Sequence, residues 1–308
     1  MRRRSFLRNT GIAAAGLSVP TILTGLPKSR EEKLKRVGMN TIPFRMSFPA
    51  TRVEGHPIVG PNLTLFDIPE YYADRFKLHN LEFWGRHFET PSPGYIADLK
   101  KAIAKTHSRL INVQLDNQPY REGNLGGYFL ASRDDAMRAK SLTFVKEWID
   151  VVAALGSDAI RVNTENGDFN LCVQSFRKIT EYAVKRNVVM LVENHGGISA
   201  NPDLHVRLIR EVNHSNIRTL PDFGNHKPEI RYEALKAIMP YAYQVSPKAL
   251  PFNAQGEHNG YDFGRCMRIA IDAGFTGIYS ADYWDRDSKS IDYEIIMDWV
   301  IDYIVEHL

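Results

Sequence analysis

Residues 154–197 read ALGSDAIRVNTENGDFNLCVQSFRKITEYAVKRNVVMLVENHGG and contain a strand pattern, a helix pattern and a second strand pattern in succession. The apolar runs 159–163 and 188–193 have the length and β-branched content of buried strands, whereas the segment between them is longer and amphipathic. Strands joined through a helix pair in parallel, because the helix carries the chain back to the start of the next strand. This stretch therefore predicts a parallel sheet covered by helices.

The same alternation continues in both directions and gives eight strand–helix pairs. The expected strands are 36–45, 81–88, 110–116, 159–163, 188–193, 217–222, 242–245 and 277–282. The expected helices include 134–155, where apolar residues recur every three to four positions, and a last helix over 291–308. Eight pairs without a Pro-rich or Ser-rich linker favour a single α/β domain, a (β/α)8 TIM barrel, over two doubly wound domains. We expect this barrel to occupy residues 29–308.

The first 28 residues have the composition of an export signal. Arg3 and Arg4 precede an uncharged stretch over residues 9–27 that is rich in Ala, Gly, Leu and Ile. Paired arginines before such a stretch resemble a twin-arginine signal, which exports folded proteins. We therefore expect residues 1–28 to be a twin-arginine-type signal peptide, read by the Tat export machinery, and the mature protein to be periplasmic. The alternative is that this segment forms a first helix of the fold.

The distribution of charge argues against nucleic acid as a partner. The sequence has 39 basic and 36 acidic side chains, but residues 1–28 contain five of the basic ones and no acid. The other residues therefore carry 34 basic and 36 acidic side chains, in short mixed runs, whereas nucleic-acid binding needs clustered cations. Beyond residue 28 no stretch reaches the roughly 18 consecutive apolar residues of a membrane span, so we expect no membrane contact in the mature form.

The two cysteines, Cys172 and Cys266, both fall in segments with a helical pattern. Two cysteines cannot form the disulfide framework that small exported domains use. We expect each to be a small buried apolar side chain, and a disulfide between them is the less favoured alternative.

Polar and aromatic side chains gather where the expected strands end, which in a TIM barrel is the end that carries the active site. We predict that the substrate is bound by Glu82, Trp84, His87, Arg161, Asn163, His195, Asn225 and Lys248. Quieter roles remain open for several of them: core packing for the tryptophan, structural hydrogen bonds for the histidines, and a solvated loop position for the lysine.

Two carboxylates, Glu193 and Asp222, follow apolar strand segments, and an ionised carboxylate at such a depth needs a cation. Neighbouring strands of one barrel would bring Glu193, Asp222, Gln244 and Asp282 around one point. This mostly oxygen set suits one divalent metal ion, either Mn²⁺ or Mg²⁺. The sequence therefore predicts a metal centre formed by these four residues.

Two alternatives to this metal set stay open. An imidazole from His226 or His258 would favour Zn²⁺. The carboxylates would otherwise pair with Arg161, with Lys248 or with backbone amides, and would then bind no metal.

Three stretches of the second half carry a further signal: 192–197 (VENHGG), 221–225 (PDFGN) and 261–277 (YDFGRCMRIAIDAGFTG). Together they resemble the sugar phosphate isomerase/epimerase family of xylose isomerase-like barrels, over about residues 155–283. The resemblance implies one divalent metal held by Glu, Asp, His and Glu from strands five to eight. Glu193 and Asp222 match this pattern, whereas Gln244 stands for the histidine and Asp282 for the last glutamate.

The resemblance also implies a reaction. Two carboxylates of the family exchange a proton with the carbon beside a metal-polarised carbonyl, which assigns Glu193 and Asp282 as catalytic residues. Because Asp282 is one methylene shorter than Glu, its oxygens would lie farther from the substrate, which implies a shifted substrate or a variant reaction such as elimination. We therefore expect a metal-dependent isomerase or epimerase acting on a neutral sugar, keto-sugar or glycoside derivative.

Other activities on this scaffold remain as alternatives. They are a keto-glycoside lyase and a non-catalytic periplasmic carbohydrate-binding barrel. The endonuclease branch of the fold is disfavoured, because the sequence lacks enough histidine ligands and a basic groove. Whether the barrel forms a homodimer through its outer helices is left open by the sequence.

Overall fold

The structure is a computed structural model, and it describes residues 28–53, 62–116, 128–253, 255–284 and 292–308. The predicted signal peptide therefore lies outside the described residues, except for Lys28. Among the helices of these described ranges, none is both long enough and apolar enough to cross a lipid bilayer.

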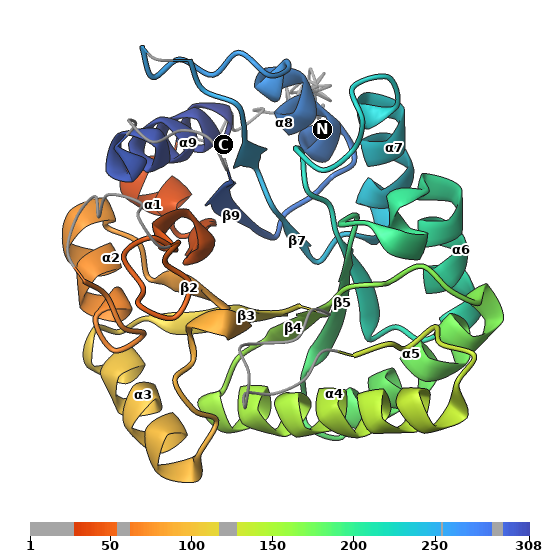
Figure 1. The fold of residues 1–308 in the computed structure, drawn as a ribbon. Helices are drawn as coiled ribbons and strands as arrows, with labels where there is room; N and C mark the ends of the chain where they lie inside the picture. The colour runs from red at the N-terminus through yellow and green to blue at the C-terminus, as the bar shows by residue number, and fades with distance from the viewer. Residues whose placement is uncertain (1–27, 54–61, 117–127, 254, 285–291) are drawn as a thin grey trace, which may run out of the picture.

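Eight parallel strands form a closed barrel within the described residues, as the sequence predicts (Figure 1). They are β1 (Val37–Asn40), β2 (Asn80–Trp84), β3 (Arg109–Leu115), β4 (Ala159–Val162), β5 (Val189–Glu193), β6 (Ile217–Leu220), β7 (Gln244–Val245) and β9 (Ile278–Tyr283). Hydrogen-bonded neighbours run from β6 down to β1 and then to β9 and β7. Parallel bridges from Thr219 to Ala242 and from Asp222 to Ser246 close the ring.

A ninth short strand, β8 (Lys248–Ala249), follows β7 and pairs with β9. Its register sets Lys248 opposite Asp282, whereas Ser246 is still bridged to Asp222 beyond β6. Within three residues the chain therefore crosses from the β6 side to the β9 side of the barrel. This crossing brings the Lys248 side chain between two neighbouring strand ends.

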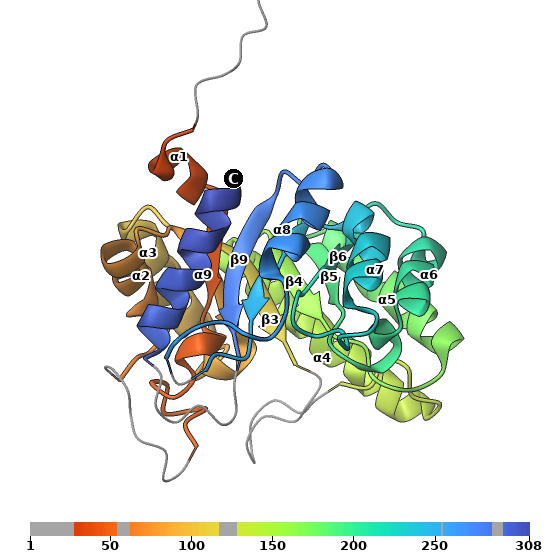
Figure 2. The ribbon, with the colours of Figure 1, turned by 90° about the horizontal axis from the view of Figure 1, so that it is seen from above.

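Helices surround the barrel on its outside (Figure 1). They are α2 (Ile68–Phe76), α3 (Pro93–Lys105), α4 (Asp135–Leu155), α5 (Phe169–Val184), α6 (Pro202–Val212), α7 (Arg231–Ile238), α8 (Phe263–Asp272) and α9 (Tyr293–His307). The short helix α1 (Arg30–Leu34) lies at the end of the barrel opposite the loops that follow the strands (Figure 2). Four 3-10 turns complete the described elements: η1 (Ile42–Phe44), η2 (Gly85–His87), η3 (Gly197–Ala200) and η4 (Met239–Tyr241).

Local chemistry sets where these elements begin and end. The first strand stops at Asn40, earlier than the predicted 36–45, because Pro43 has no amide hydrogen for a strand ladder and instead sits in η1. The side chain of Asp134 accepts a hydrogen bond from the amide of Met137 and begins α4. Gly156 ends the same helix in the left-handed region with a φ of 77°.

The core fills the space between the strands and the helices with apolar side chains, including Val37, Leu81, Val113, Ile160 and Met190. Cys172 on α5 and Cys266 on α8 are buried free thiols, so the prediction for the cysteines is confirmed. The interior of the barrel differs, because charged and amide side chains are buried there at the C-terminal ends of the strands. These polar side chains form the candidate site.

Candidate active site

A cavity of about 240 Å³ opens at the C-terminal end of the strands, the end where TIM barrels carry their active sites. One part of its wall is apolar and aromatic, and consists of Ile42, Trp84, Leu250 and Trp284. The other part is polar, and consists of Arg86, Gln114, Asp116, Arg161, His195, Asn225 and Lys248. A wider hollow beside α1 lies at the opposite end of the barrel, which is not the end that carries active sites in this fold.

Lys248 lies at the centre of three buried carboxylates. Its Nζ is 2.7 Å from Asp222 Oδ2, 3.5 Å from Asp282 Oδ2 and 3.8 Å from Glu193 Oε1. It also donates a hydrogen bond of 3.2 Å to Asn225 Oδ1. Lys248 is 6% exposed and each of the three acids is at most 1% exposed, so water screens these charges little. We call these four residues, Lys248, Glu193, Asp222 and Asp282, the lysine cluster.

The lysine cluster keeps its lysine charged. Burial alone would lower the pKa of Lys248, but the neighbouring Asp222, Asp282 and Glu193 carboxylates outweigh it and hold this pKa well above its usual range. Burial raises the pKa of both Asp222 and Asp282, and the Lys248 ammonium opposes that shift. The balance between lysine and acids is therefore an ion-pair network that needs all of its members.

Asp222 is fixed by contacts from its own loop. Its Oδ1 accepts hydrogen bonds from the backbone amides of Gly224 (2.8 Å) and Asn225 (3.0 Å). The hydroxyl of Ser246 donates to Oδ2 over 3.1 Å. At Gly224 a Cβ atom would lie 2.5 Å from the Leu250 side chain and 3.3 Å from the Lys248 carbonyl oxygen, so glycine permits this close approach of the two loops.

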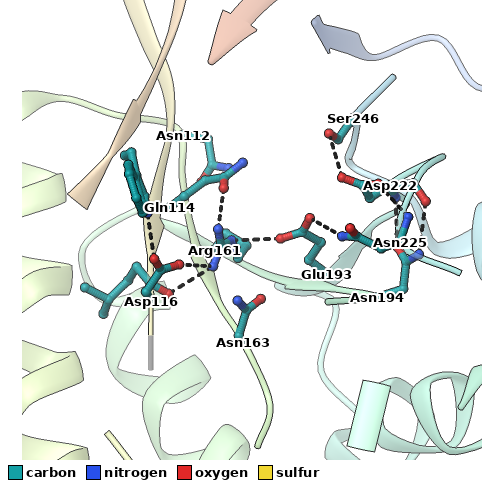
Figure 3. Close-up of polar contacts among 12 residues, drawn as sticks. Asn112, Gln114, Asp116, Arg161, Asn163, Glu193, Asn194, Asp222, Asn225 and Ser246 are labelled. Carbon is teal, nitrogen blue, oxygen red and sulfur yellow. Dashed lines mark hydrogen bonds and ion pairs between the residues drawn. The ribbon is translucent and has the colours of Figure 1, made fainter. Parts of the chain in front are cut away.

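Arg161, on β4, contacts Glu193 of the lysine cluster on one side and Asp116 of the cavity wall on the other (Figure 3). Its Nε lies 3.1 Å from Glu193 Oε2, and its NH1 donates to Asp116 Oδ1 over 3.0 Å. Its NH2 donates to Gln114 Oε1. Glu193 also accepts a hydrogen bond of 2.9 Å from the amide of Asn225. Arg161 and Lys248 are therefore two fixed cations that face the cavity, and both contact Glu193.

Glu82, on β2, forms a second buried site, and no cation of the described ranges forms an ion pair with it. Its Oε1 accepts hydrogen bonds from Asn112 (2.7 Å) and Gln114 (2.8 Å), and its Oε2 accepts one from Gln244 (2.8 Å). Burial raises the pKa of Glu82 to about 7, although the Ser280 hydroxyl and the amides of Gln114 and Asn112 lower it. We call Glu82, Asn112, Gln114 and Gln244 the amide cradle.

The aromatic wall of the cavity is held by polar anchors. The indole of Trp84 donates a hydrogen bond of 2.7 Å to Asp116 Oδ2, and its ring packs edge-to-face against Trp284 with centroids 6.1 Å apart. Guanidinium groups cover both rings, with Arg86 5.1 Å from the Trp84 centroid and Arg45 4.2 Å from that of Trp284. Flat apolar faces beside polar groups are the arrangement that sugar rings need, because their C–H faces are apolar and their edges carry hydroxyls.

His195 follows β5 and presents its imidazole to the cavity, where solvent reaches it. Desolvation by the surrounding protein and the charges of Arg161 and Lys248 lower the pKa of His195 below its usual value. The imidazole is therefore neutral near pH 7, and one of its nitrogens is available as a proton acceptor.

Five of the eight predicted substrate-binding residues line the cavity: Trp84, Arg161, His195, Asn225 and Lys248. Glu82 lies deeper, in the amide cradle. His87 is 2% exposed, stacks on Phe48 with centroids 3.7 Å apart, and has its ring nitrogens 2.9 and 3.1 Å from two threonine hydroxyls. Asn163 is buried beside Arg161 (Figure 3), and its backbone amide donates to the Tyr128 hydroxyl.

The four predicted metal ligands do not share one centre. The amide nitrogen of Gln244 donates to Glu82, so this side chain belongs to the amide cradle, and Ser246, which follows β7, contacts Asp222 instead. Glu193, Asp222 and Asp282 do converge, but the point on which they converge holds the Lys248 ammonium. Within the described ranges, no group of three or more His, Cys, Asp and Glu side chains has a geometry suited to a metal ion.

Neither histidine alternative completes a metal set. His258 packs among Phe252, Tyr261, Phe263 and Trp299, and its Nε2 lies 3.3 Å from the Leu250 carbonyl oxygen. His226 is buried, and burial lowers its pKa to about 4. A divalent ion and the ammonium cannot occupy the same centre, since like charges repel strongly in a buried site. The arrangement therefore does not fit the predicted metal and instead matches the alternative in which the carboxylates pair with Lys248 and Arg161.

Several cavity residues escaped the sequence analysis. Gln114 and Asp116 stand two residues apart at the end of the predicted strand 110–116, so they point to the same face, and this spacing was the available signal. Arg86 lies next to residues that were singled out. Ser246 carried no signal of its own, because a single serine after a strand is common.

Residues 76–303 match the family model described as xylose isomerase-like TIM barrel, and the chain belongs to this family of sugar isomerase/epimerase-like barrels. No curated protein sequence matches the chain. Among solved structures, a xylose isomerase-like TIM barrel protein from Mycobacterium smegmatis in complex with magnesium has 15% identity and a TM-score of 0.61, over 89% of this chain and 97% of that one.

Two further structures carry assigned activities. A 3-keto-D-glucoside 4-epimerase from E. coli has 14% identity and a TM-score of 0.61, over 86% of this chain and 98% of that one. A probable 3-DHS dehydratase from Bacillus anthracis has 14% identity and a TM-score of 0.60, over 85% and 97% of the two chains. At these identities the likeness establishes the shared fold.

Proposed function

We propose that the cavity binds a neutral keto-sugar or keto-glycoside and that the protein transfers a proton at the carbon beside its carbonyl group. The observation that carries this proposal is the pair of cations, Lys248 and Arg161, fixed by buried carboxylates and presented to the cavity. Removing a proton beside a carbonyl places negative charge on the carbonyl oxygen. Cations that are already oriented stabilise that charge without reorganisation at the moment of reaction.

The proposed roles follow the cavity wall. His195 takes the proton from carbon, the C–H electron pair forms a carbon–carbon double bond, and the carbonyl electrons move to the oxygen beside Lys248 and Arg161. Protonation of the same carbon by water on the opposite face gives an epimer. Return of the proton from His195 to the former carbonyl carbon, while the proton of the neighbouring hydroxyl passes to the carbonyl oxygen, gives an isomer. Loss of a group from the next carbon would give elimination. Trp84 and Trp284 would pack against the sugar ring, and Asn225 and Asp116 would bind hydroxyls.

Glu193 and Asp282 receive a different role from the one that the family resemblance implies. Both are at most 1% exposed, and both face the Lys248 ammonium. We propose that they position Lys248 and that proton transfer falls to His195, which reaches the cavity. Together with Asp222 and Asp116, these acids offset the charges of Lys248 and Arg161. The cavity therefore has no surplus positive charge for a phosphate, which favours a neutral substrate.

The test is exchange of solvent deuterium into candidate substrates. The protein would be incubated in D2O with a panel of ketohexoses and 3-keto-glycosides, and the products would be followed by proton NMR and mass spectrometry. We expect incorporation of one deuterium by the wild type and a loss of about 100-fold or more with His195→Gln. His79→Gln, exposed at the opposite end of the barrel, is the control. Sugar binding without any exchange would instead favour the carbohydrate-binding barrel.

We further propose export to the periplasm through residues 1–28. The support is the pair Arg3 and Arg4 before an uncharged stretch. Cell fractionation of a bacterium that expresses the full chain would test it. Substituting both arginines with lysine is expected to retain the protein in the cytoplasm, and unchanged export would contradict the proposal.

A further inference from the structure

Three carboxylates from three different strand ends meet at one cation that belongs to the chain itself. Glu193 ends β5, Asp222 follows β6 and Asp282 lies on β9, and the Nζ of Lys248 is within 3.8 Å of an oxygen of each. Convergent acids of this kind are the usual setting of a divalent ion. In this protein the ammonium group of the Lys248 side chain occupies the point between the three carboxylates.

We infer that Lys248 replaces the divalent metal ion in this barrel, so that the protein has a tethered cation and needs no metal. The inference deepens the proposed function and rests on it for the chemistry, because the ammonium then meets the carbonyl oxygen of the substrate. The replacement of the cation itself rests on the geometry of the lysine cluster.

The total charge supports the replacement. Arg161 contacts the far oxygen of Glu193 at 3.1 Å, while Lys248 contacts the near oxygen and both aspartates. Two monovalent cations thus supply the same charge as one divalent ion, distributed over two points at the cavity wall. Both side chains are donors of hydrogen bonds, so they can also bind the substrate oxygen directly.

The backbone around Lys248 is built to hold it in place. Strand β8 sets Lys248 opposite Asp282, and the hydroxyl of Tyr261 donates to the Lys248 carbonyl oxygen. Gly224 leaves room for the lysine stem, because a Cβ there would lie 3.4 Å from Lys248 Cδ and closer still to Leu250. A side chain that merely reached the site from a solvated loop would not need these contacts.

Two polar side chains near the lysine cluster form hydrogen bonds to acids instead of offering oxygen ligands to a metal ion. Gln244 gives its amide hydrogen to Glu82, and Ser246 gives its hydroxyl hydrogen to Asp222. A divalent ion would therefore need to displace Lys248 from three acids at a 6% exposed position. The arrangement disfavours the metal both by charge and by the supply of ligands.

The test is Mn²⁺ binding to the mature protein after treatment with a chelator, followed by electron paramagnetic resonance and by thermal unfolding. We expect the wild type to bind no Mn²⁺ in the micromolar range and to unfold at the same temperature with Mn²⁺ or with EDTA. Lys248→Met removes the ammonium but keeps the length of the side chain. We expect this variant to bind Mn²⁺ at least about 100-fold more tightly and to be stabilised by it, because three uncovered acids then act as ligands.

Lys236→Met, which removes an exposed lysine paired with Glu233, is the matched control and should behave as the wild type does. If Lys248→Met folds only when Mn²⁺ is present, the same conclusion follows from its metal-dependent folding. Tight Mn²⁺ binding by the wild type that is lost in Glu193→Gln would overturn the inference. So would a folded Lys248→Met protein that binds no Mn²⁺, because the acids would then not form a metal position.

The proposal of proton transfer and the inference that Lys248 replaces a metal ion can be contradicted independently. Metal binding needs no substrate, so a wild type without metal and without deuterium exchange would leave the replacement standing and remove the catalytic proposal. A wild type that exchanges deuterium only with bound metal would keep the catalytic proposal and remove the replacement.

Discussion

Two groups of buried carboxylates lie at the same end of the barrel, and the protein balances them in different ways. The amide cradle surrounds Glu82 with three neutral donors, Asn112, Gln114 and Gln244. The lysine cluster surrounds one ammonium with three acids. Gln114 connects them, since its amide nitrogen donates to Glu82 and its oxygen accepts from Arg161.

The difference shows how a buried acid acquires its chemical character. Neutral donors leave the charge of Glu82 costly, so its pKa rises to about 7 and the group changes its protonation near neutral pH. In the lysine cluster the opposite charge is present, and the lysine is held in its charged form. The first arrangement gives a proton-sensitive structural site, and the second gives a permanent cation at the wall of the cavity.

Removal of the cation should have the largest effect. Lys248→Met leaves buried acids without their partner, which we expect to cost about 3–5 kcal/mol of unfolding free energy. Urea denaturation at pH 7 in the presence of EDTA measures this loss. Lys236→Met should change stability by less than about 0.5 kcal/mol. A loss below about 1 kcal/mol in Lys248→Met would mean that the acids were not balanced by this lysine.

The amide cradle should make stability depend on pH. The pKa of Glu82 is about 7 when folded and near 4.5 in the unfolded chain, so the folded state binds the proton more tightly. Its contribution is complete below pH 4.5 and is lost as the pH rises through 7, by up to about 3 kcal/mol. Glu82→Gln should remove this part of the profile. Urea denaturation from pH 4.5 to 8 measures it, and parallel profiles for the two proteins would contradict the assignment.

Removal of one hydrogen-bond donor should lower the free energy of unfolding more in the amide cradle than in the lysine cluster. Gln244→Leu leaves Glu82 Oε2 without the donor described here, and we expect a cost of about 1–3 kcal/mol at pH 8. Ser246→Ala removes a donor to Asp222 Oδ2, but that oxygen keeps Lys248 at 2.7 Å, so we expect less than about 1 kcal/mol. Denaturation of both variants at one pH compares them, and the reverse order would break the contrast.

An exposed ion pair provides the lower limit of the series. Lys101 and Asp98 lie 2.9 Å apart on α3, with side chains that are 77% and 65% exposed. We expect Lys101→Ala to change stability by less than about 0.5 kcal/mol, because water and salt screen the pair. A loss comparable to that of Lys248→Met would show that burial does not determine the strength of these contacts.

The fold was predictable from the sequence because it depends on patterns that repeat along the chain. Apolar runs and amphipathic segments alternate eight times, and the eight strands lie where the runs predict them. The errors are at the ends of elements. The predicted strands 36–45 and 81–88 continue too far, because 3-10 turns begin at Ile42 and Gly85, and Pro43 within the first turn has no amide hydrogen for a strand ladder.

The candidate site was predictable in part. Trp84, Arg161, His195, Asn225 and Lys248 meet at one cavity, because the C-terminal ends of parallel strands share one end of a barrel. The partners of Gln244 were not predictable. Gln244 and Ser246 point to the same side of the chain at successive levels, and the register between strands decides which of them meets Asp222. The sequence also could not show that the chain crosses to β9 and carries Lys248 into the acids.

A crystal structure of the mature protein grown in millimolar Mn²⁺, with anomalous data collected near the manganese edge, shows whether Lys248 or a metal ion occupies the centre between the three acids. We predict that no anomalous peak lies between Glu193, Asp222 and Asp282, and that Lys248 Nζ remains in ion-pair contact with all three. A strong anomalous peak at this position, with the lysine turned out into the cavity, would contradict the account.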